Sequence, residues 1–355
     1  MTSLTSTPDD PVEPHKPRWS RVAVSLVVLL ALVAVGTVVA VATGSSGRPI
    51  AEVLASLTRF DALHSLDASP TDRIVWNVRL PRVALGLLVG CNLAVAGVLL
   101  QGIMRNPLAS PGIIGVTVGA ALFASLAILG VTDLIGIPWL ATLSLPMMAF
   151  IGALLATMLV YVMSWQPGVG TSPTRMILAG VAVTAMLGAF QSFLSVYFAD
   201  RIQGVVLWLS GSLNARSWNH LPMIWPFTIL GLVIAALLVR PLNLLQLGDD
   251  SAAALGVPVQ TVRIGAIVAA ALLTASAVCV AGVVGFVGLV VPHIVRTAVA
   301  RDHAGLIPAA ALGGAALVVW SDAAARQLDE MPVGILTALI GGPYFVFLLY
   351  RKKLI

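Results

Sequence analysis

Continuous apolar runs recur along the chain, and they constrain its fold more than any other feature. Each run is about 18–25 residues long, which as a helix of about 1.5 Å rise per residue matches the bilayer hydrocarbon core, about 30 Å thick. Strands of a membrane barrel alternate apolar and polar residues, and these runs do not alternate. Because only helices and closed barrels satisfy their backbone hydrogen bonds in lipid, the sequence predicts an all-α integral membrane protein.

The balance of residue types excludes an ordinary soluble domain. Of the 355 residues, 59% are hydrophobic and 10% are charged, whereas soluble domains carry about 25% charged residues. The chain therefore has too few polar side chains to cover a soluble core of this size. We attribute its net charge of +5 to basic residues that flank cytoplasmic helix ends, rather than to binding of nucleic acid.

The apolar runs predict about ten transmembrane helices. They lie at residues 22–42, 82–104, 112–130, 141–163, 175–198, 221–239, 261–283, 286–300, 305–321 and 332–350. Between the seventh and eighth runs, Gly285, Gly288 and Pro292 interrupt the pattern, as glycine and proline do at breaks or re-entrant turns. The first run exceeds the apolar stretch of about 7–15 residues in a cleaved signal peptide, which is the alternative interpretation of that segment.

Basic residues near the helix ends predict the orientation of the chain in the cell membrane. Residues 1–19 are polar and proline-rich, which indicates a disordered cytoplasmic tail, and residues 20–355 then form a single transmembrane domain. An even number of spans puts both termini on one side, and a cytoplasmic N-terminus then places both termini and most Lys and Arg residues in the cytoplasm, which is the favoured sense of the bias. One external segment opposes this bias, with arginines at positions 48, 59, 73, 79 and 82. This excess requires a reason other than topology.

Residue patterns for catalysis or metal binding are not found in the sequence. A phosphate loop for ATP requires Gly-Lys-Ser/Thr, and none of the lysines, Lys16, Lys352 and Lys353, follows a glycine. No cluster of His, Cys, Asp or Glu has metal-ligand spacing. We therefore predict that the chain is not an enzyme and holds no catalytic residue, metal or cofactor. ATP and Mg²⁺ would bind a separate ATPase.

Two other classes of membrane function compete with an ATP-driven importer. An ion-coupled secondary transporter usually needs ionisable side chains within its spans, and here only Asp322 and His293 come close to that position. Uptake that persists without ATP and collapses with the proton gradient would favour this class. A membrane scaffold that transports nothing is the third class, and it predicts no flux.

One predicted cytoplasmic loop has the features of a partner contact. It runs Leu247-Gly-Asp-Asp-Ser-Ala-Ala-Ala-Leu-Gly256. The acids Asp249 and Asp250 suit a helix start, and Gly256 suits a helix stop. The composition is compatible both with a short amphipathic helix and with a plain connecting loop.

A short internal similarity indicates an inverted repeat. Residues 94–98, Ala-Val-Ala-Gly-Val, resemble residues 279–283, Cys-Val-Ala-Gly-Val, in the second and seventh predicted spans. Because five spans separate the two segments, their helices would run in opposite directions. Inverted repeats of this kind are common in transporters.

Over roughly residues 70–350 the chain resembles the FecCD-type permeases, the membrane subunits of ABC importers for ferric siderophores, haem and vitamin B12. The segments that carry the resemblance are Arg79-Leu-Pro-Arg82, Gln101 to Gly115, Leu247 to Val257, Gly285 to Arg296 and Pro332 to Phe345. Within them we single out as family motif residues Gln101, Asn106, Pro107, Gly112, Gly285, Gly288, Pro292 and His293. The order and spacing of these segments make the resemblance specific.

The resemblance implies the type II ABC importer permease fold, with ten helices, an inverted repeat and a pathway formed with a second permease subunit, either a second copy or a paralogue. It implies two cytoplasmic ATPases and an external substrate-binding protein as partners. The ATPase-coupling residues would be Leu247, Gly248, Asp249, Asp250, Ser251, Leu255 and Gly256. Arg79, Arg82 and Arg326 would receive carboxylates of the binding protein. Alternatively, these arginines pair within the chain, with Asp322, Asp329 or Glu330.

The resemblance also implies a substrate and a mechanism. An iron(III)-siderophore is the commonest substrate of the family, and haem and cobalamin are alternatives that no residue of this sequence separates. Transport would proceed by alternating access, driven by movement of the segment 247–256. We expect the second span and the fifth span, near Met176–Phe198, to form most of the pathway wall. This wall lacks charge and would not hold the substrate tightly.

Overall fold

The computed structural model describes residues 18–44, 48–59, 69–131 and 143–350, and within these ranges the chain is helical apart from turns and one isolated bridge between Gln166 and Gly170. Of the tail predicted at residues 1–19, residues 1–17 lie outside the described residues. The first helix already includes Arg18 and Trp19. The all-α prediction is confirmed.

Among the described residues, seven helices are long and apolar enough to cross a membrane, and three shorter apolar helices accompany them. They are α1 (Arg18–Ala42), α4 (Leu80–Met104), α5 (Val116–Ile128), α8 (Leu145–Ser164), α9 (Pro173–Tyr197), α11 (Trp225–Leu237), α14 (Val259–Ala281), α15 (Val287–Ala298), α16 (His303–Gln327) and α17 (Val333–Tyr350). Each coincides with one of the predicted apolar runs, so the prediction of about ten spans is confirmed.

Short helices occupy the two ends of this bundle. One end carries α2 (Ile50–Ser56), α3 (Pro70–Ile74) and the π-helical turn Val75–Arg79, which continues directly into α4. The opposite end carries α12 (Val239–Leu245) and α13 (Asp249–Ala254). The helix α10 (Ile202–Leu209) follows α9 and was not predicted. Three short 3₁₀ segments, Pro111–Ile114, Ala199–Arg201 and Trp218–Met223, complete the described helices.

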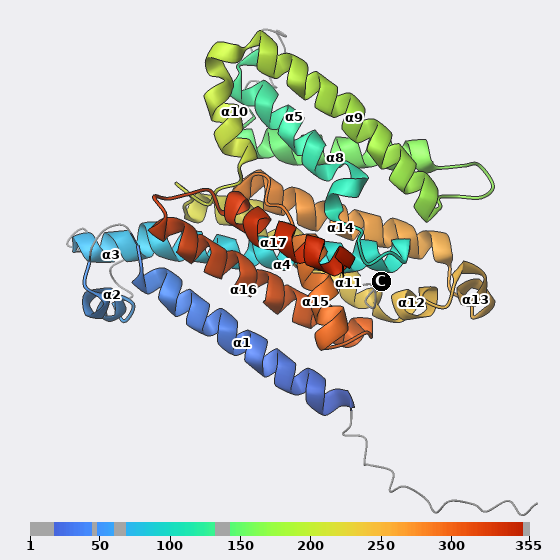
Figure 1. Ribbon diagram of the computed structural model, residues 1–355, viewed down its shortest axis with the longest axis horizontal. Coiled ribbons are helices and arrows are strands. Elements are labelled where there is room, and N and C mark those ends of the chain that lie inside the picture. The colour runs from blue at the N-terminus through green and yellow to red at the C-terminus, as the bar shows by residue number, and fades with distance from the viewer. Residues whose placement is uncertain (1–17, 45–47, 60–68, 132–142, 351–355) are drawn as a thin grey trace, which may run out of the picture.

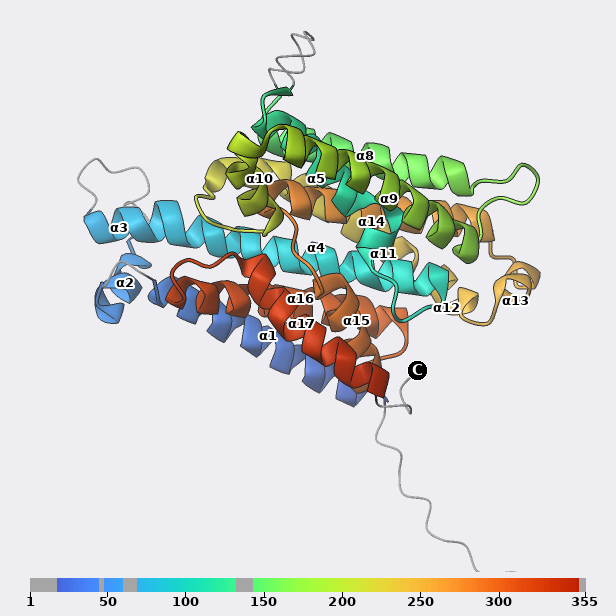
Figure 2. The ribbon, with the colours of Figure 1, turned by 45° about the horizontal axis from the view of Figure 1, so that its top comes forward.

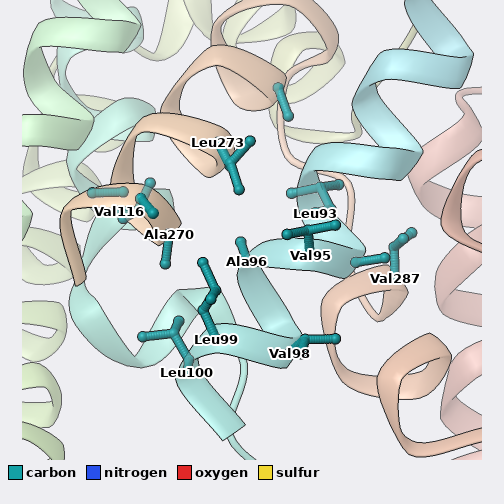
Figure 3. Close-up of a cluster of buried hydrophobic side chains, with 14 of the residues drawn as sticks. Leu93, Val95, Ala96, Val98, Leu99, Leu100, Val116, Ala270, Leu273 and Val287 are labelled. Atoms are coloured by element: carbon teal, nitrogen blue, oxygen red, sulfur yellow. The ribbon is translucent and has the colours of Figure 1, made fainter. Parts of the chain in front are cut away.

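Helix α4 lies in the centre of the molecule, between α14 on one side and α16 on the other (Figures 1 and 2). Helices α5, α8 and α9 pack together beyond α14, and α1 packs on the outer side of α16. Figure 3 shows the apolar core around α4, where Leu93, Leu99 and their neighbours meet Leu273 of α14 and Val287 of α15. Burial of such side chains against helices, rather than lipid, fixes the arrangement through close contact.

The position of α4 corrects one prediction. The second span was expected to form part of a pathway wall, but no residue of Leu80–Met104 is exposed, and the helix is enclosed by its neighbours. A pathway shared with a second subunit needs surface on the outside of this one. The prediction for the second span is therefore wrong, because α4 is the core helix of the subunit.

Two of the spans are discontinuous. Helix α5 begins only at Val116, after a largely non-helical stretch at residues 105–115, and α15 begins only at Val287, after residues 282–286. The two stretches meet: a methyl group added to Gly288 would lie 2.8 Å from Cδ of Pro111 and 2.7 Å from the carbonyl oxygen of Leu93 in the middle of α4. Irregular backbone at this depth is tolerated because protein surrounds it.

The predicted break between residues 261 and 300 is confirmed at 282–286, but Pro292 does not interrupt a helix. Pro292 lies inside α15 and has no N–H to donate to the carbonyl of Gly288, four residues earlier. That carbonyl oxygen faces α4 instead, where a methyl group added to Gly97 would lie 1.9 Å from it. Only glycine fits at residue 97, which allows α4 and α15 to approach this closely.

We expect Gly97→Ala to destabilise the folded protein by about 1–3 kcal/mol, because the added methyl group would force two backbones apart. The measurement is the thermal unfolding midpoint of the purified chain in detergent. Gly188→Ala in α9 is the matched control, since no atom lies within 4 Å of the position that its methyl group would take. Equal unfolding midpoints for the two variants would contradict this account of the α4–α15 contact.

Candidate functional site

The predicted coupling segment forms a helix with an exposed face. Helix α13 begins at Asp249 after Gly248, whose φ of 110° is readily adopted only by glycine. It ends before Gly256, whose φ is 81°. Within α13, Ala252 is fully buried against the rest of the protein, whereas the flanking Leu247 and Leu255 are 63% and 60% exposed. Of the two interpretations of this loop, the helix is therefore the one observed.

The exposed side of α13 also carries polar residues. Asp250 and Ser251 are exposed beside the two leucines. Exposed leucines at a bundle end, on a helix too short to span a membrane, form a surface suited to a protein partner. The residues predicted to contact an ATPase are thus exposed, with the exception of Gly248 and Asp249, which are half-buried.

Asp249 bonds within its own chain rather than facing outward. One carboxylate oxygen lies 2.6 Å from Nη2 of Arg263 in α14, and the other lies 3.2 Å from Nη2 of Arg105, the residue after α4. Arg263 is buried, and its Nη1 donates to the carbonyl of Thr171 at 2.8 Å. A carboxylate shared by two guanidinium groups ties α13 to α4 and α14.

The two arginine partners of Asp249 were missed in the sequence. A signal existed for Arg263, because it is a lone charged residue inside an apolar run, and such residues in membrane helices are costly unless paired. Arg105 follows the second run directly and resembled an ordinary basic flank. The sequence does not show that Arg105 and Arg263 pair with Asp249. Asp249 comes 14 residues before Arg263 and 144 residues after Arg105.

The opposite end of the molecule gathers the three arginines predicted to receive a binding protein. Arg82 donates from Nε and Nη2 to the carboxylate of Asp322, at 2.9–3.1 Å. Its Nη1 donates to Glu330 at 2.8 Å. Arg326 lies 3.3 Å from the same Asp322 carboxylate. All three arginines, Arg79, Arg82 and Arg326, are buried.

Arg79 donates hydrogen bonds to the C-terminal end of α1. Its Nη1 donates to the carbonyls of Val41 and Ala42, at 2.6 and 3.1 Å. These are the last residues of α1, where free carbonyls and the helix dipole favour a cation. The pairing alternative from the sequence is therefore observed for Arg82 and Arg326, with Asp322 and Glu330 as partners. Docking of a binding protein by these arginines stays a prediction.

The remaining motif residues surround the discontinuous spans. Gly112, Gly285 and Gly288 line one cavity of about 140 Å³ with Pro111 and Thr274. Their small size leaves room where α4, α14 and α15 meet. The sequence singled out these glycines, but the cavity exists only because the two non-helical stretches come together.

Polar motif residues close the loop that follows α4. Gln101 donates from Nε2 to the carbonyls of Ala109 and Leu289, each at 3.3 Å. Asn106 accepts the backbone N–H of Leu108 at 2.9 Å across Pro107. These bonds satisfy backbone groups of the loop after α4 and connect Gln101 of α4 to that loop and to α15. His293 is buried in α15, 6.4 Å from the ring of Tyr344 between centroids, and its ring nitrogens have no hydrogen-bond partner among the described residues.

Helix α9 presents an exposed, uncharged face. Leu178, Val181 and Met186 are among its exposed apolar residues. Towards its C-terminal end the rings of Phe190, Phe193 and Tyr197 form a row, with centroids 6.1 and 5.8 Å apart. In the part of the chain that the structure describes, no group of three or more His, Cys, Asp or Glu side chains could hold a metal ion.

Comparison with known proteins assigns these features to one family. The profile of the FecCD transport family matches residues 22–351. The hemin transport system permease protein HmuU of Yersinia pestis is 44% identical over 290 residues, covering 79% of this chain and 84% of the relative. The cobalamin import system permease protein BtuC of Halobacterium salinarum is 41% identical over 281 residues, covering 79% and 74%.

A third relative and a solved structure agree with them. The Fe(3+) dicitrate transport system permease protein FecD of Escherichia coli is 40% identical over 283 residues, covering 79% of this chain and 86% of the relative. An inward-facing metal-chelate type ABC transporter superposes with a TM-score of 0.76 at 32% identity, covering 92% of this chain and 98% of that one. The profile match over most of the chain and the identity to these relatives show that this chain belongs to the FecCD transport family of ABC importer permeases.

Proposed function

We propose that this permease imports an iron(III)-siderophore across the cell membrane. The observation that carries the proposal is that the relatives are named for metal chelates of similar kind, hemin, cobalamin and ferric dicitrate. The exposed face of α9 supports it, because an uncharged wall with a row of aromatic rings offers apolar contact without trapping an anionic or neutral chelate. Haem is the second candidate, favoured by the 44% identity to a hemin permease.

The pathway would lie between α9 of this chain and a second permease subunit. Two cytoplasmic ATPases would bind the exposed face of α13, which would place both termini in the cytoplasm. An external binding protein would deliver the chelate at the opposite end. There the exposed Arg48 and Arg59, above the buried Arg79, Arg82 and Arg326, supply positive potential for acidic side chains.

A chain of contacts connects α13 to the proposed pathway wall. Asp249 holds Arg263, and Arg263 and Gln260 of α14 both bond Thr171, which lies directly before α9. Movement of α13 by ATPase closure would thus reach the start of α9 through charged and polar contacts rather than through loose loops. Alternating access would follow from rocking of α9 and its neighbours.

Uptake into proteoliposomes tests the substrate. The complete transporter, with its ATPase and binding protein, is supplied with radiolabelled ferric siderophore, hemin or cobalamin, with and without internal ATP. ATP-dependent uptake of the ferric siderophore above the other two supports the proposal, and preferential uptake of hemin would establish the second candidate instead. Uptake without ATP that a proton ionophore abolishes would contradict an ATP-driven importer.

The exposed face of α13 predicts a specific loss of ATPase binding. We expect Leu255→Asp to weaken association with the ATPase by about 30-fold, because it places a charge where an apolar anchor, worth about 2 kcal/mol, would be buried. Co-purification and titration of the ATPase measure the effect. Leu328→Asp is the matched control, since Leu328 is exposed to a similar degree, 53%, after α16 at the other end. Unchanged ATPase affinity of the Leu255 variant would place the ATPase elsewhere.

A further inference from the structure

A cavity lined by arginines lies at the α13 end of the molecule and belongs to none of the sites described above. Its volume is about 480 Å³, and it lies between the start of α1, the end of α15 and the start of α16. Arg21 comes from α1, Arg296 from α15, and Arg301 and Asp302 from the turn between α15 and α16. Three cations and one carboxylate therefore face one space.

The positive charge in this cavity is not balanced by the described part of the chain. None of its three arginines forms an ion pair with a described residue. The carboxylate of Asp302 already accepts a hydrogen bond from the side chain of Asn243. The Nη2 nitrogen of Arg296 is buried and has no hydrogen-bond partner among the described residues. A buried charged donor without an acceptor is costly, which indicates that an external acceptor belongs there.

The chemistry of the site selects a phosphate group. Guanidinium groups match phosphate oxygens with paired hydrogen bonds, and the N-terminus of α16, beginning at His303, adds partial positive charge on the same side. Apart from Thr297 the remaining lining is apolar, with Val22, Ala298 and Val299 beside the charged groups. A phosphate with an apolar extension satisfies both parts of the surface.

The location selects a lipid rather than a soluble phosphate compound. Arg21 directly precedes the apolar stretch of α1, and Arg296 lies in the last turn of α15, so both lie where spans leave the membrane. Basic pockets between helices at a cytoplasmic surface bind the head groups of anionic lipids. We propose that this cavity binds the phosphate of an anionic phospholipid such as phosphatidylglycerol.

A lipid in this cavity would also act on the coupling region. Asn243 of α12 accepts the backbone N–H of His303 at 3.0 Å and contacts Asp302. Gln246, just after α12, lies 3.2 Å from the ring of His303. Helix α12 leads directly to α13, so a head group that fixes the turn between α15 and α16 would also support the base of α13. The inference rests on the membrane fold and does not depend on which chelate is transported.

Native mass spectrometry of the full chain in detergent tests the site, with phosphatidylglycerol and phosphatidylcholine of identical acyl chains as probes. We expect selective binding of phosphatidylglycerol. Arg296→Gln should weaken it about fivefold, and Arg296→Gln with Arg301→Gln about 25-fold, at about 1 kcal/mol for each arginine. Arg175→Gln, an exposed arginine at the start of α9, is the matched control and should bind as the unchanged protein does.

Four results would overturn the proposal. Equal binding of the two lipids, or equal binding by the Arg296 variant, would show that the cavity does not select the head group. Competition by inorganic phosphate without preference for phosphatidylglycerol would assign it to a soluble anion. Binding that appears only after deletion of residues 2–17, which include Asp9, Asp10 and Glu13, would assign the arginines to the chain's own acidic segment. If Arg296→Gln fails to fold, the exposed Arg21→Gln gives the same comparison.

Discussion

Asp322→Asn is expected to destabilise the folded permease by about 3–5 kcal/mol, the usual cost of removing one partner from a buried ion pair. The change keeps the size of the side chain but removes a carboxylate that Arg82 and Arg326 share. Both arginines are buried, so water cannot replace the lost charge. The measurement is the unfolding free energy, or the thermal midpoint, of the purified chain in detergent.

Asp250→Asn is the control for this experiment, because Asp250 is exposed and lies at the other end of the molecule. It should leave the unfolding midpoint unchanged. A midpoint for Asp322→Asn equal to that of the control would mean that the cluster contributes nothing to stability. The arginines would then be free to serve a binding protein.

This result also decides how docking should be tested. Reversal of Arg82 to glutamate would place a third carboxylate beside Asp322 and Glu330, and the protein would fail for reasons unrelated to docking. The exposed Arg48 is the better position for charge reversal, because Arg59 lies 3.6 Å from the buried carboxylate of Asp72. Affinity for the binding protein should be compared at low salt, where contacts between exposed charges are strongest.

Asp249→Asn is expected to uncouple transport from ATP hydrolysis. Loss of the carboxylate charge weakens the contacts from α13 to Arg263 and Arg105, while the exposed face with Leu247 and Leu255 stays intact. The ATPase should therefore remain bound, and transport per ATP should fall about tenfold, within the usual range of coupling between sites. Uptake and hydrolysis measured in the same proteoliposomes give this ratio.

The neighbouring acid provides the matched comparison. Asp250→Lys changes the exposed face instead, so it should weaken ATPase binding without altering the ratio of uptake to hydrolysis in the complexes that form. Arg263→Gln should reproduce the part of this effect that passes through Arg263, and the double variant should be no worse than Asp249→Asn alone, since the contact between Asp249 and Arg263 is weakened in all three. Detachment of the ATPase by Asp249→Asn would contradict an internal role for this residue.

Several features of the protein could be predicted from the sequence because their causes are local. A bilayer accepts only apolar segments of a certain length, so the runs predict the ten apolar helices to within a few residues. Glycine and acids at the ends of residues 248–256 made a short helix one of two interpretations of that loop, and the structure has α13 there. The motif segments predict the family, because their order and spacing along the chain can be compared without knowing which residues are in contact.

Other features were decided by the tertiary structure. Hydrophobicity reports that α1 and α4 both avoid water, but it does not distinguish a helix covered by lipid from one covered by protein. Helix α1 lies at the edge and α4 is the core, although both are equally apolar in pattern. The prediction of a pathway wall along the second span failed for this reason.

The same reason applies to charges and short elements. An arginine near a helix end looks alike in sequence whether it faces water or a carboxylate 240 residues away, as Arg82 does with Asp322. Helix α10 is too short to be recognised in the sequence as a membrane span. The position of residues 105–115 inside the bundle follows from the contact of Pro111 with Gly288 rather than from the composition of the segment. Sequence determined which segments enter the membrane, because transfer into lipid is a property of each segment. Only the tertiary structure decided which of them face one another, because burial against protein depends on residues far away in the chain.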